Sequence, residues 1–236
     1  MISFNKYLSL DGLQIKQHEF NSFGELEPTA EWIAMRKGVV TASRVHDIIK
    51  KGRAKDSKSE AYMTYAKELA LSIITTSSQK EVRNHALEWG RNNENEARKA
   101  FELVTLETVD EVGFIYGDES LRYGVSPDGL VNGRHGVEIK CPYNSINHLD
   151  FIMHGTIKPE YISQVQFSLW VTGFESWSFV SYDPRFKQRQ LEFATITPDL
   201  EMFATFEEEI PVFTKVVDEI LNSFNLKFGD QWNGSV

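Results

Sequence analysis

Cysteine is almost absent from this chain, because Cys141 is the single one among 236 residues. A lone cysteine excludes a disulfide framework and a zinc site built on cysteines, and it fits a reducing compartment. The chain also lacks a long hydrophobic run, and the residues after Met1 contain no apolar segment of the signal-peptide type. We therefore expect a cytoplasmic protein without a membrane span.

An excess of positive charge is lacking as well. The net charge of −9 argues against a general nucleic-acid binder. Residues 36–58, however, contain eight basic side chains against two acidic ones, a local charge of +6 that leaves −15 for the remainder. This uneven distribution suits a protein that contacts a polyanion through one surface, although a solvated charged loop would give the same pattern.

Repeats and low-complexity linkers are absent too, and the chain is predicted to form one domain over residues 1–236. The hydrophobic pattern predicts helices at 29–37, 43–50, 60–75, 84–104, 160–172 and 199–222, with Ser43 as the N-cap of the second. It predicts strands at 111–116, 121–126, 136–140, 175–182 and 190–197. This mixture indicates an α/β or α+β fold.

Two carboxylates and a lysine form the most informative pattern, namely Asp128 followed by Glu138 and Lys140. Asn132-Gly133 between them predicts a hairpin that brings Asp128 beside Glu138. Side chains alternate along a strand, so Glu138 and Lys140 project together. Two hard oxygen donors can bind Mg²⁺ or Mn²⁺, and a nearby lysine can hold or deprotonate the attacking water of a phosphodiester hydrolysis. A turn followed by a solvent-facing strand would give the same local pattern.

Three further polar residues are candidates for the same site. Glu94 lies on the apolar face of the helix predicted at 84–104, so its carboxylate needs a cation or a metal; a core salt bridge is the alternative. Asp118 ends a strand just before the Asp128 segment, and taken alone this position favours a simple turn residue. Gln164 is either a core amide with satisfied hydrogen bonds or a polar side chain that reaches the same site.

Together these motifs resemble the lambda-exonuclease-like, YqaJ-type branch of the PD-(D/E)XK nucleases. The resemblance covers almost the whole chain. It is carried by residues 32–43, 86–90 with Glu94-Asn95, 115–120, 126–130, 138–142, 164–172, 182–185 and 228–232.

The resemblance implies an α/β fold with a restriction-endonuclease-like αβββαβ core, a central mixed sheet flanked by helices, and added N- and C-terminal helices. It implies a Mg²⁺-dependent exonuclease, with Mn²⁺ as a substitute, that digests the 5′ strand of double-stranded DNA processively to 5′-mononucleotides and leaves a 3′ overhang for strand annealing.

The same resemblance implies roles for individual residues. Asp128, Glu138 and the Ile139 carbonyl would bind one ion, and Asp118 with Asp128 a second. Lys140 would orient the attacking water, with Glu94 and Gln164 as support. The remaining roles concern DNA: Arg36, Ser43 and Ser126 would bind the 5′-phosphate, Leu87 would separate the terminal base pair, and Arg53 would contact the duplex.

Two departures from the family pattern concern the grip on DNA. Ile146 stands where the family has a second phosphate-binding arginine. In this chain Asn147, His148 or a lysine of the basic segment are the candidates to replace that arginine. His85 stands where the family has a lysine.

Alternative functions are a PD-(D/E)XK endonuclease of the restriction or junction-resolving type, and a DNA-end binding module without catalysis. The intact acidic residues and Lys140 argue against the last. The resemblance also implies a ring-shaped homotrimer, a single-strand annealing protein as partner, and a phage or prophage origin in a bacterial host.

Overall fold

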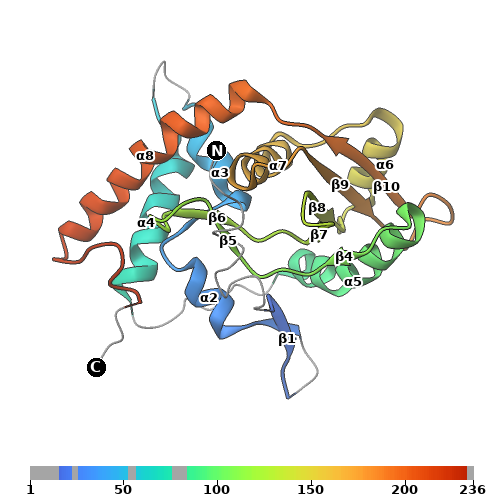
Figure 1. The fold of residues 1–236 in the computed structure, drawn as a ribbon, viewed down its shortest axis with the longest axis horizontal. Helices are drawn as coiled ribbons and strands as arrows, with labels where there is room; N and C mark the ends of the chain where they lie inside the picture. The colour runs from blue at the N-terminus through green and yellow to red at the C-terminus, as the bar shows by residue number, and fades with distance from the viewer. Residues whose placement is uncertain (1–15, 23–25, 53–56, 76–83, 233–236) are drawn as a thin grey trace.

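The computed structural model describes residues 16–22, 26–52, 57–75 and 84–232, and Figure 1 shows their arrangement. The helices are α2 (Ala30–Arg36), α3 (Val45–Ile49), α4 (Glu60–Ile74), α5 (His85–Thr105), α6 (Ser145–His154), α7 (Pro159–Thr172) and α8 (Leu200–Asn222), with a 3-10 turn, η2 (Ala42–Arg44), before α3. The strands are β1 (His18–Phe20), β2 (Leu26–Pro28), β3 (Val40–Thr41), β4 (Val109–Asp110), β5 (Ile115–Tyr116), β6 (Tyr123–Val125), β7 (Gly129–Val131), β8 (His135–Lys140), β9 (Ser176–Tyr182) and β10 (Leu191–Ile196).

The largest sheet has the strand order β10-β9-β8-β7-β4. Strands β8 and β9 pair in parallel and the other neighbours are antiparallel, so the sheet is mixed. The chain order α5-β4-β7-β8-α7-β9 is the expected αβββαβ core, and the predicted α/β fold is confirmed.

The composition of that core differs from the prediction in one respect. The strands predicted at 111–116 and 121–126 contain β5 and β6, which pair with β3 in a separate three-stranded sheet. The two core strands that precede β8 are instead β4, which lies just before the strand predicted at 111–116, and β7, a short segment within the predicted hairpin. Three residues with a glycine at the start give too little periodicity to identify a strand.

The two faces of β8 carry different side chains, as its alternation predicts. Val137 and Ile139 are buried in a hydrophobic cluster with Ala97 and Phe101 of α5. Glu138 lies on the other face, where α7 packs. In Figure 1 the green α5 and the golden-brown α7 lie on opposite sides of the sheet, with α4 and the orange α8 beyond α7.

Local signals explain where the helices begin and end. Asn84 caps α5 by accepting a hydrogen bond from the backbone of Ala86, and Pro159 occupies the first turn of α7. Helix α6 was not predicted, although Asn144 caps its start and Gly155 follows its end with a φ of +64°. Ser43 is not an N-cap: it lies within η2, whose N-cap is Thr41.

In the part of the chain that the structure describes, no helix combines the length and apolar character needed to cross a membrane.

Candidate active site

The β7–β8 hairpin brings Asp128 beside Glu138, as predicted. Gly129 pairs with Val137, and the backbone N–H of Asp128 donates to the Val137 carbonyl at 3.2 Å. The Asp128 carboxylate in turn accepts a hydrogen bond from the Ile139 N–H, with 2.6 Å between Oδ2 and N. These two contacts hold the Asp128 carboxylate against the backbone of β8, at the residue next to Glu138.

Glu138 is 2% exposed and accepts two hydrogen bonds on one oxygen. Lys140 Nζ lies 2.5 Å from its Oε1, and Gln164 Nε2 lies 2.6 Å from the same atom. Gln164, buried on α7, therefore reaches into the site and does not merely satisfy the core. Lys140 Nζ also lies 5.0 Å from the centroid of the Tyr161 ring, a cation–π contact that sequence reasoning did not anticipate.

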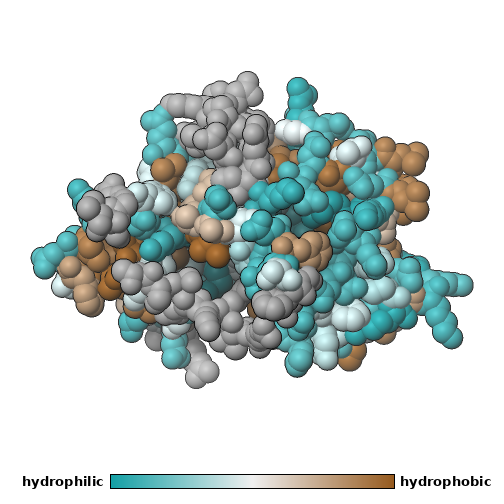
Figure 2. Space-filling view, turned by 90° about the horizontal axis from the view of Figure 1, so that it is seen from below, coloured by the Kyte–Doolittle hydropathy of each residue, from teal (hydrophilic) through white to brown (hydrophobic). Residues whose placement is uncertain are grey.

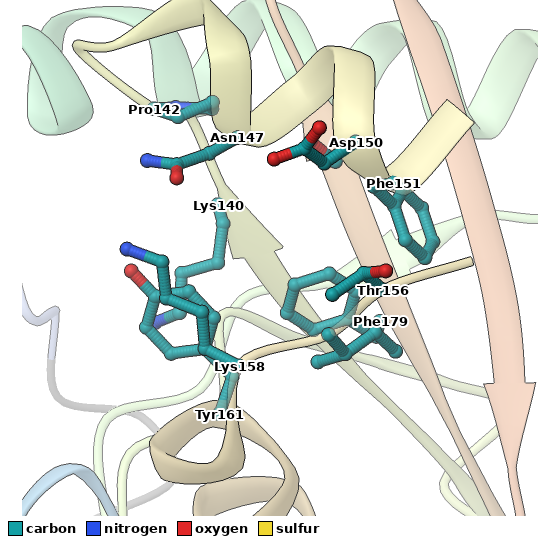
Figure 3. Close-up of a pocket in the computed structure, with 11 residues that line it drawn as sticks. Lys140, Pro142, Asn147, Asp150, Phe151, Thr156, Lys158, Tyr161 and Phe179 are labelled. Atoms are coloured by element: carbon teal, nitrogen blue, oxygen red, sulfur yellow. The ribbon is translucent and has the colours of Figure 1, made fainter. Parts of the chain in front are cut away.

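A pocket opens beside Lys140 between α6 and α7 (Figure 3). Asn147 and Asp150 line it from α6, Lys158 and Tyr161 from the start of α7, and Phe179 from β9. Lys140 thus contacts Glu138 and also forms part of the wall of an open pocket, so a substrate group in this pocket would lie next to the lysine.

Glu94 joins the site from α5, on the opposite side of the sheet from α7. Its Oε1 accepts a hydrogen bond from Arg98 at 2.9 Å, and the Asp128 and Glu138 carboxylates act on it electrostatically. The alternative reading of this acid, a salt bridge, is therefore confirmed, although its side chain is 31% exposed and not enclosed in the core. Arg98 was missed, although its position four residues after Glu94 on a helix was a readable signal.

The three carboxyl groups are unusually basic. Burial, and next the Asp128 carboxylate, raise the pKa of Glu94 to about 8. Burial also raises the pKa of Glu138 to about 7, and it raises the pKa of Asp128. Burial alone would lower the pKa of Lys140, but the Glu138 and Asp128 carboxylates raise it above its usual value. The lysine is therefore an ammonium ion at neutral pH.

Asp118 does not join this cluster. Its Oδ1 accepts a hydrogen bond from the Ser120 N–H at 2.9 Å, and its Oδ2 accepts one from the Tyr123 hydroxyl at 3.0 Å. In the β5–β6 pairing Asp118 follows β5 at the Tyr123 end, whereas Asp128 follows β6 at the other end. Among the described residues there is no group of three or more His, Cys, Asp or Glu side chains with metal-binding geometry.

Trp32 links two of the residues expected to bind a 5′-phosphate. Its Nε1 donates to Ser126 Oγ at 2.8 Å, and the guanidinium carbon of Arg36 lies 3.8 Å from its ring centroid. Ser43 is exposed, and its Oγ lies 3.4 Å from Thr41 Oγ1. Trp32 is a second residue that sequence reasoning missed, although it precedes Arg36 by four positions.

His148 is unsuited to replace the arginine missing at Ile146. It is fully buried, with Nδ1 2.7 Å from Ser181 Oγ and Nε2 2.9 Å from the Arg189 carbonyl. That suggested compensation is wrong, because both ring nitrogens are already used. Asn147, by contrast, lines the pocket beside Lys140.

The residues expected to contact duplex DNA are only partly described. Leu87 lies in the first turn of α5 and is 49% exposed, which excludes the alternative that it is a core residue. Arg53 lies outside the described residues. In the basic segment, Arg44 forms ion pairs with Asp47 and Glu68, and Lys58 pairs with Glu209.

The chemistry of the donors fits a divalent cation. Asp128 and Glu138 offer hard carboxylate oxygens, and burial, with repulsion by Asp128 as a smaller cause, raises the pKa of Glu138. A cation between the two carboxylates would relieve that repulsion. The Lys140 ammonium group relieves part of this repulsion through its ion pair with Glu138.

Comparisons with known proteins agree with this geometry. A family model described as the YqaJ-like viral recombinase domain matches residues 31–175. The alkaline exonuclease LHK-Exo from Laribacter hongkongensis is 36% identical, with a TM-score of 0.74, and the match covers 84% of this chain and 97% of that one. The same enzyme has been solved in complex with dAMP.

Two further relatives match a smaller part of the chain or match it at lower identity. The uncharacterized protein ExoD of Escherichia coli K12 is 41% identical over 76 residues, which are 32% of this chain and 87% of that protein. A phage-related exonuclease from Haemophilus somnus 129PT shares the fold, with a TM-score of 0.62 at 15% identity over 79% of this chain and 96% of that one. Because the family model spans more than half of the chain, the chain belongs to the YqaJ-like viral recombinase family, and it shares its fold with an alkaline exonuclease.

Proposed function

We propose that this protein is a divalent-metal-dependent exonuclease that digests the 5′ strand of double-stranded DNA processively to 5′-mononucleotides. The product is a duplex with a 3′ single-stranded overhang, ready for strand annealing. The observation that carries the proposal is the contact set of Asp128, Glu138 and Lys140 beside an open pocket. A relative named alkaline exonuclease, crystallised with a mononucleotide, supports the choice of reaction.

The carboxylates hold the metal in this proposal. Asp128, Glu138 and the Ile139 carbonyl bind one Mg²⁺, Asp118 and Asp128 bind a second, and Mn²⁺ can substitute. The bound ions supply Lewis acidity to the scissile phosphodiester. Asp118 and Asp128 follow opposite ends of the β5–β6 pairing, so a second ion shared by their carboxylates requires this segment to rearrange.

Lys140 orients the attacking water and stabilises developing negative charge. Its raised pKa favours these tasks over proton abstraction, because an ammonium group has no free lone pair. Gln164 fixes Glu138 by donating to its Oε1, and Glu94 adds negative charge from the α5 side.

The DNA end is held by a second set of residues. Arg36, Ser43 and Ser126 bind the 5′-phosphate, with Trp32 aligning the first and the last. The exposed Leu87 separates the terminal base pair, and Arg53 contacts the duplex ahead of the site. Loss of the second arginine at Ile146 predicts a reduced preference for phosphorylated ends.

The proposed partners are double-stranded DNA ends, two further copies of the chain in a ring-shaped homotrimer, and a single-strand annealing protein of the same recombination pair. The setting is the cytoplasm of a bacterial host, with a phage or prophage gene. The molar mass of the purified protein in solution tests the trimer directly.

Digestion of linear and covalently closed circular duplexes separates the proposal from its alternatives. With Mg²⁺ an exonuclease degrades only the linear form, and chelation of the metal stops it. Cleavage of the closed circle would support the endonuclease, and binding without release of nucleotides would support the inactive end-binding module.

A further inference from the structure

The segment that carries Asp128 into the site, residues 126–128, is held by side chains from distant parts of the chain. Besides the Trp32 contact with Ser126, Gln17 Nε2 donates to the Pro127 carbonyl at 2.7 Å. Arg98 Nε donates to the carbonyl of Asp128 itself at 3.2 Å. The position of the Asp128 backbone therefore depends on side chains outside the hairpin.

Arg98 differs from the other two donors because it also bonds carboxylates. Its Nη2 lies 2.9 Å from Glu94 Oε1, and its Nη1 lies 2.7 Å from Glu111 Oε1. The Arg98 side chain is 10% exposed, whereas that of Glu111 is 73% exposed. One buried guanidinium thus spans α5, the Asp128 backbone and the segment after β4.

The geometry of a guanidinium makes this bridge rigid. Its five N–H donors lie in one plane with fixed directions, so three partners bound at once are held at fixed relative positions. The apolar contacts of Ala97 and Phe101 with the sheet are non-directional by comparison. Charge-assisted hydrogen bonds are also the stronger kind.

We infer that Arg98 is a positioning residue, which fixes the Asp128 backbone and the supporting Glu94 carboxylate relative to each other and so places Asp128 for binding the ion. The inference rests on the proposed function, since it assumes that Asp128 binds a divalent ion. Arg98 contacts neither the ion nor the DNA in this account, and it acts only through Glu94 and the Asp128 backbone.

The test measures Mn²⁺ binding by electron paramagnetic resonance, with Mn²⁺ as the only added ligand and circular dichroism to verify folding. Arg98→Ala should lower Mn²⁺ affinity by about 10–100-fold, the usual cost of losing a group that orients a metal ligand. In DNA digestion kcat should fall as well, while KM stays close to the wild-type value because the DNA contacts remain.

Two variants complete the design. Arg98→Lys keeps the charge but cannot reach both Glu94 and the Asp128 carbonyl, so it should lose an intermediate amount of affinity and should fold even if the alanine variant does not. Glu111→Gln is the matched control: it alters the exposed partner and leaves both inner hydrogen bonds, so its Mn²⁺ affinity should equal that of the wild type.

A folded Arg98→Ala or Arg98→Lys protein with wild-type Mn²⁺ affinity and wild-type kcat would overturn the inference, even if its melting temperature were lower. Such a result would make Arg98 a purely structural residue. Failure of the wild type itself to bind Mn²⁺ would instead contradict the proposed ion site, so the two failures are distinguishable.

Discussion

At the scale of single residues, the balance of charge around Lys140 explains its role. A buried lysine without partners loses its proton readily, but here Glu138 lies within hydrogen-bonding distance and Asp128 adds to the negative field. The ammonium form therefore persists. Because the same carboxylate oxygen also binds Gln164, the lysine is held by a fixed partner and not by solvent.

Lys140→Ala should abolish cleavage with little effect on folding or DNA binding. A positioned group of this kind contributes about 10²–10⁴-fold to the rate, and single-turnover digestion with DNA-binding measurements separates the two effects. Lys187→Ala, which removes an exposed lysine of the loop after β9, is the control. Retention of more than about a tenth of the wild-type rate by K140A would contradict the assigned role.

The raised carboxyl pKa values predict a pH-dependent response to metal. Glu94, with a pKa of about 8 in place of about 4.5, binds its proton more tightly in the folded state. The free energy of unfolding of the metal-free protein should therefore fall as pH rises between those values. A divalent ion needs the deprotonated carboxylates, so its stabilising effect should grow over the same range.

Thermal denaturation with and without Mg²⁺ checks this prediction. The increase in melting temperature caused by Mg²⁺ should be larger at pH 8.5 than at pH 6, and Glu138→Gln should remove most of it. Equal increases at both pH values in the wild type would contradict the account of the site.

At the scale of elements, the long helices and strands could be predicted from the sequence, whereas several short strands and the ten-residue α6 could not. Helices α5 and α8 extend over many turns, so their periodicity was readable, and β8 and β9 alternate clearly. Strands β3, β4 and β7 have two or three residues each, too few for a period to register.

The candidate site shows the same division. Asp128, Glu138 and Lys140 lie close in the chain around one turn, so the hairpin could be inferred from local signals. Arg98 and Trp32 bond residues 30 and 94 positions away, and such contacts are fixed by the packing of α5 and α2 against the sheet segments. No local pattern encodes those distances.

The link between α2 and residue 126 predicts a defined effect on DNA ends. The wild type should digest 5′-phosphorylated ends faster than 5′-hydroxyl ends, and Arg36→Ala should erase the difference, because Arg36 supplies the cation that Trp32 aligns. Initial rates on matched substrates measure this. Equal rates on both ends in the wild type, unchanged in R36A, would show that no phosphate pocket operates here.

At the scale of the whole molecule, negative charge dominates, and residues 36–58 carry a local excess of positive charge. The face in Figure 2 is mainly hydrophilic, and its apolar side chains gather in separate small groups. Ion pairs neutralise Arg44 and Lys58 within the basic segment, whereas Lys50 and Lys51 are exposed. Fewer positive charges are therefore available to a polyanion than the local charge of +6 in the sequence indicates.

Binding to linear duplex should still weaken as salt rises from roughly 50 to 200 mM, since each phosphate contact releases counterions. Replacing Lys50 and Lys51 together by Gln should reduce the slope of log affinity against log salt by roughly 2. Lys215→Gln on α8 should leave the slope unchanged. A flat salt dependence in the wild type would mean that the basic segment does not contact DNA.

The central claim, directional digestion of one strand from a duplex end, is tested most directly with a linear duplex that carries different labels at the 5′ and 3′ ends of one strand. With Mg²⁺ the account predicts early release of the 5′ label as a mononucleotide, while the 3′ label of the same strand remains in long DNA. Early release of the 3′ label, or internal fragments that carry either label, would contradict it.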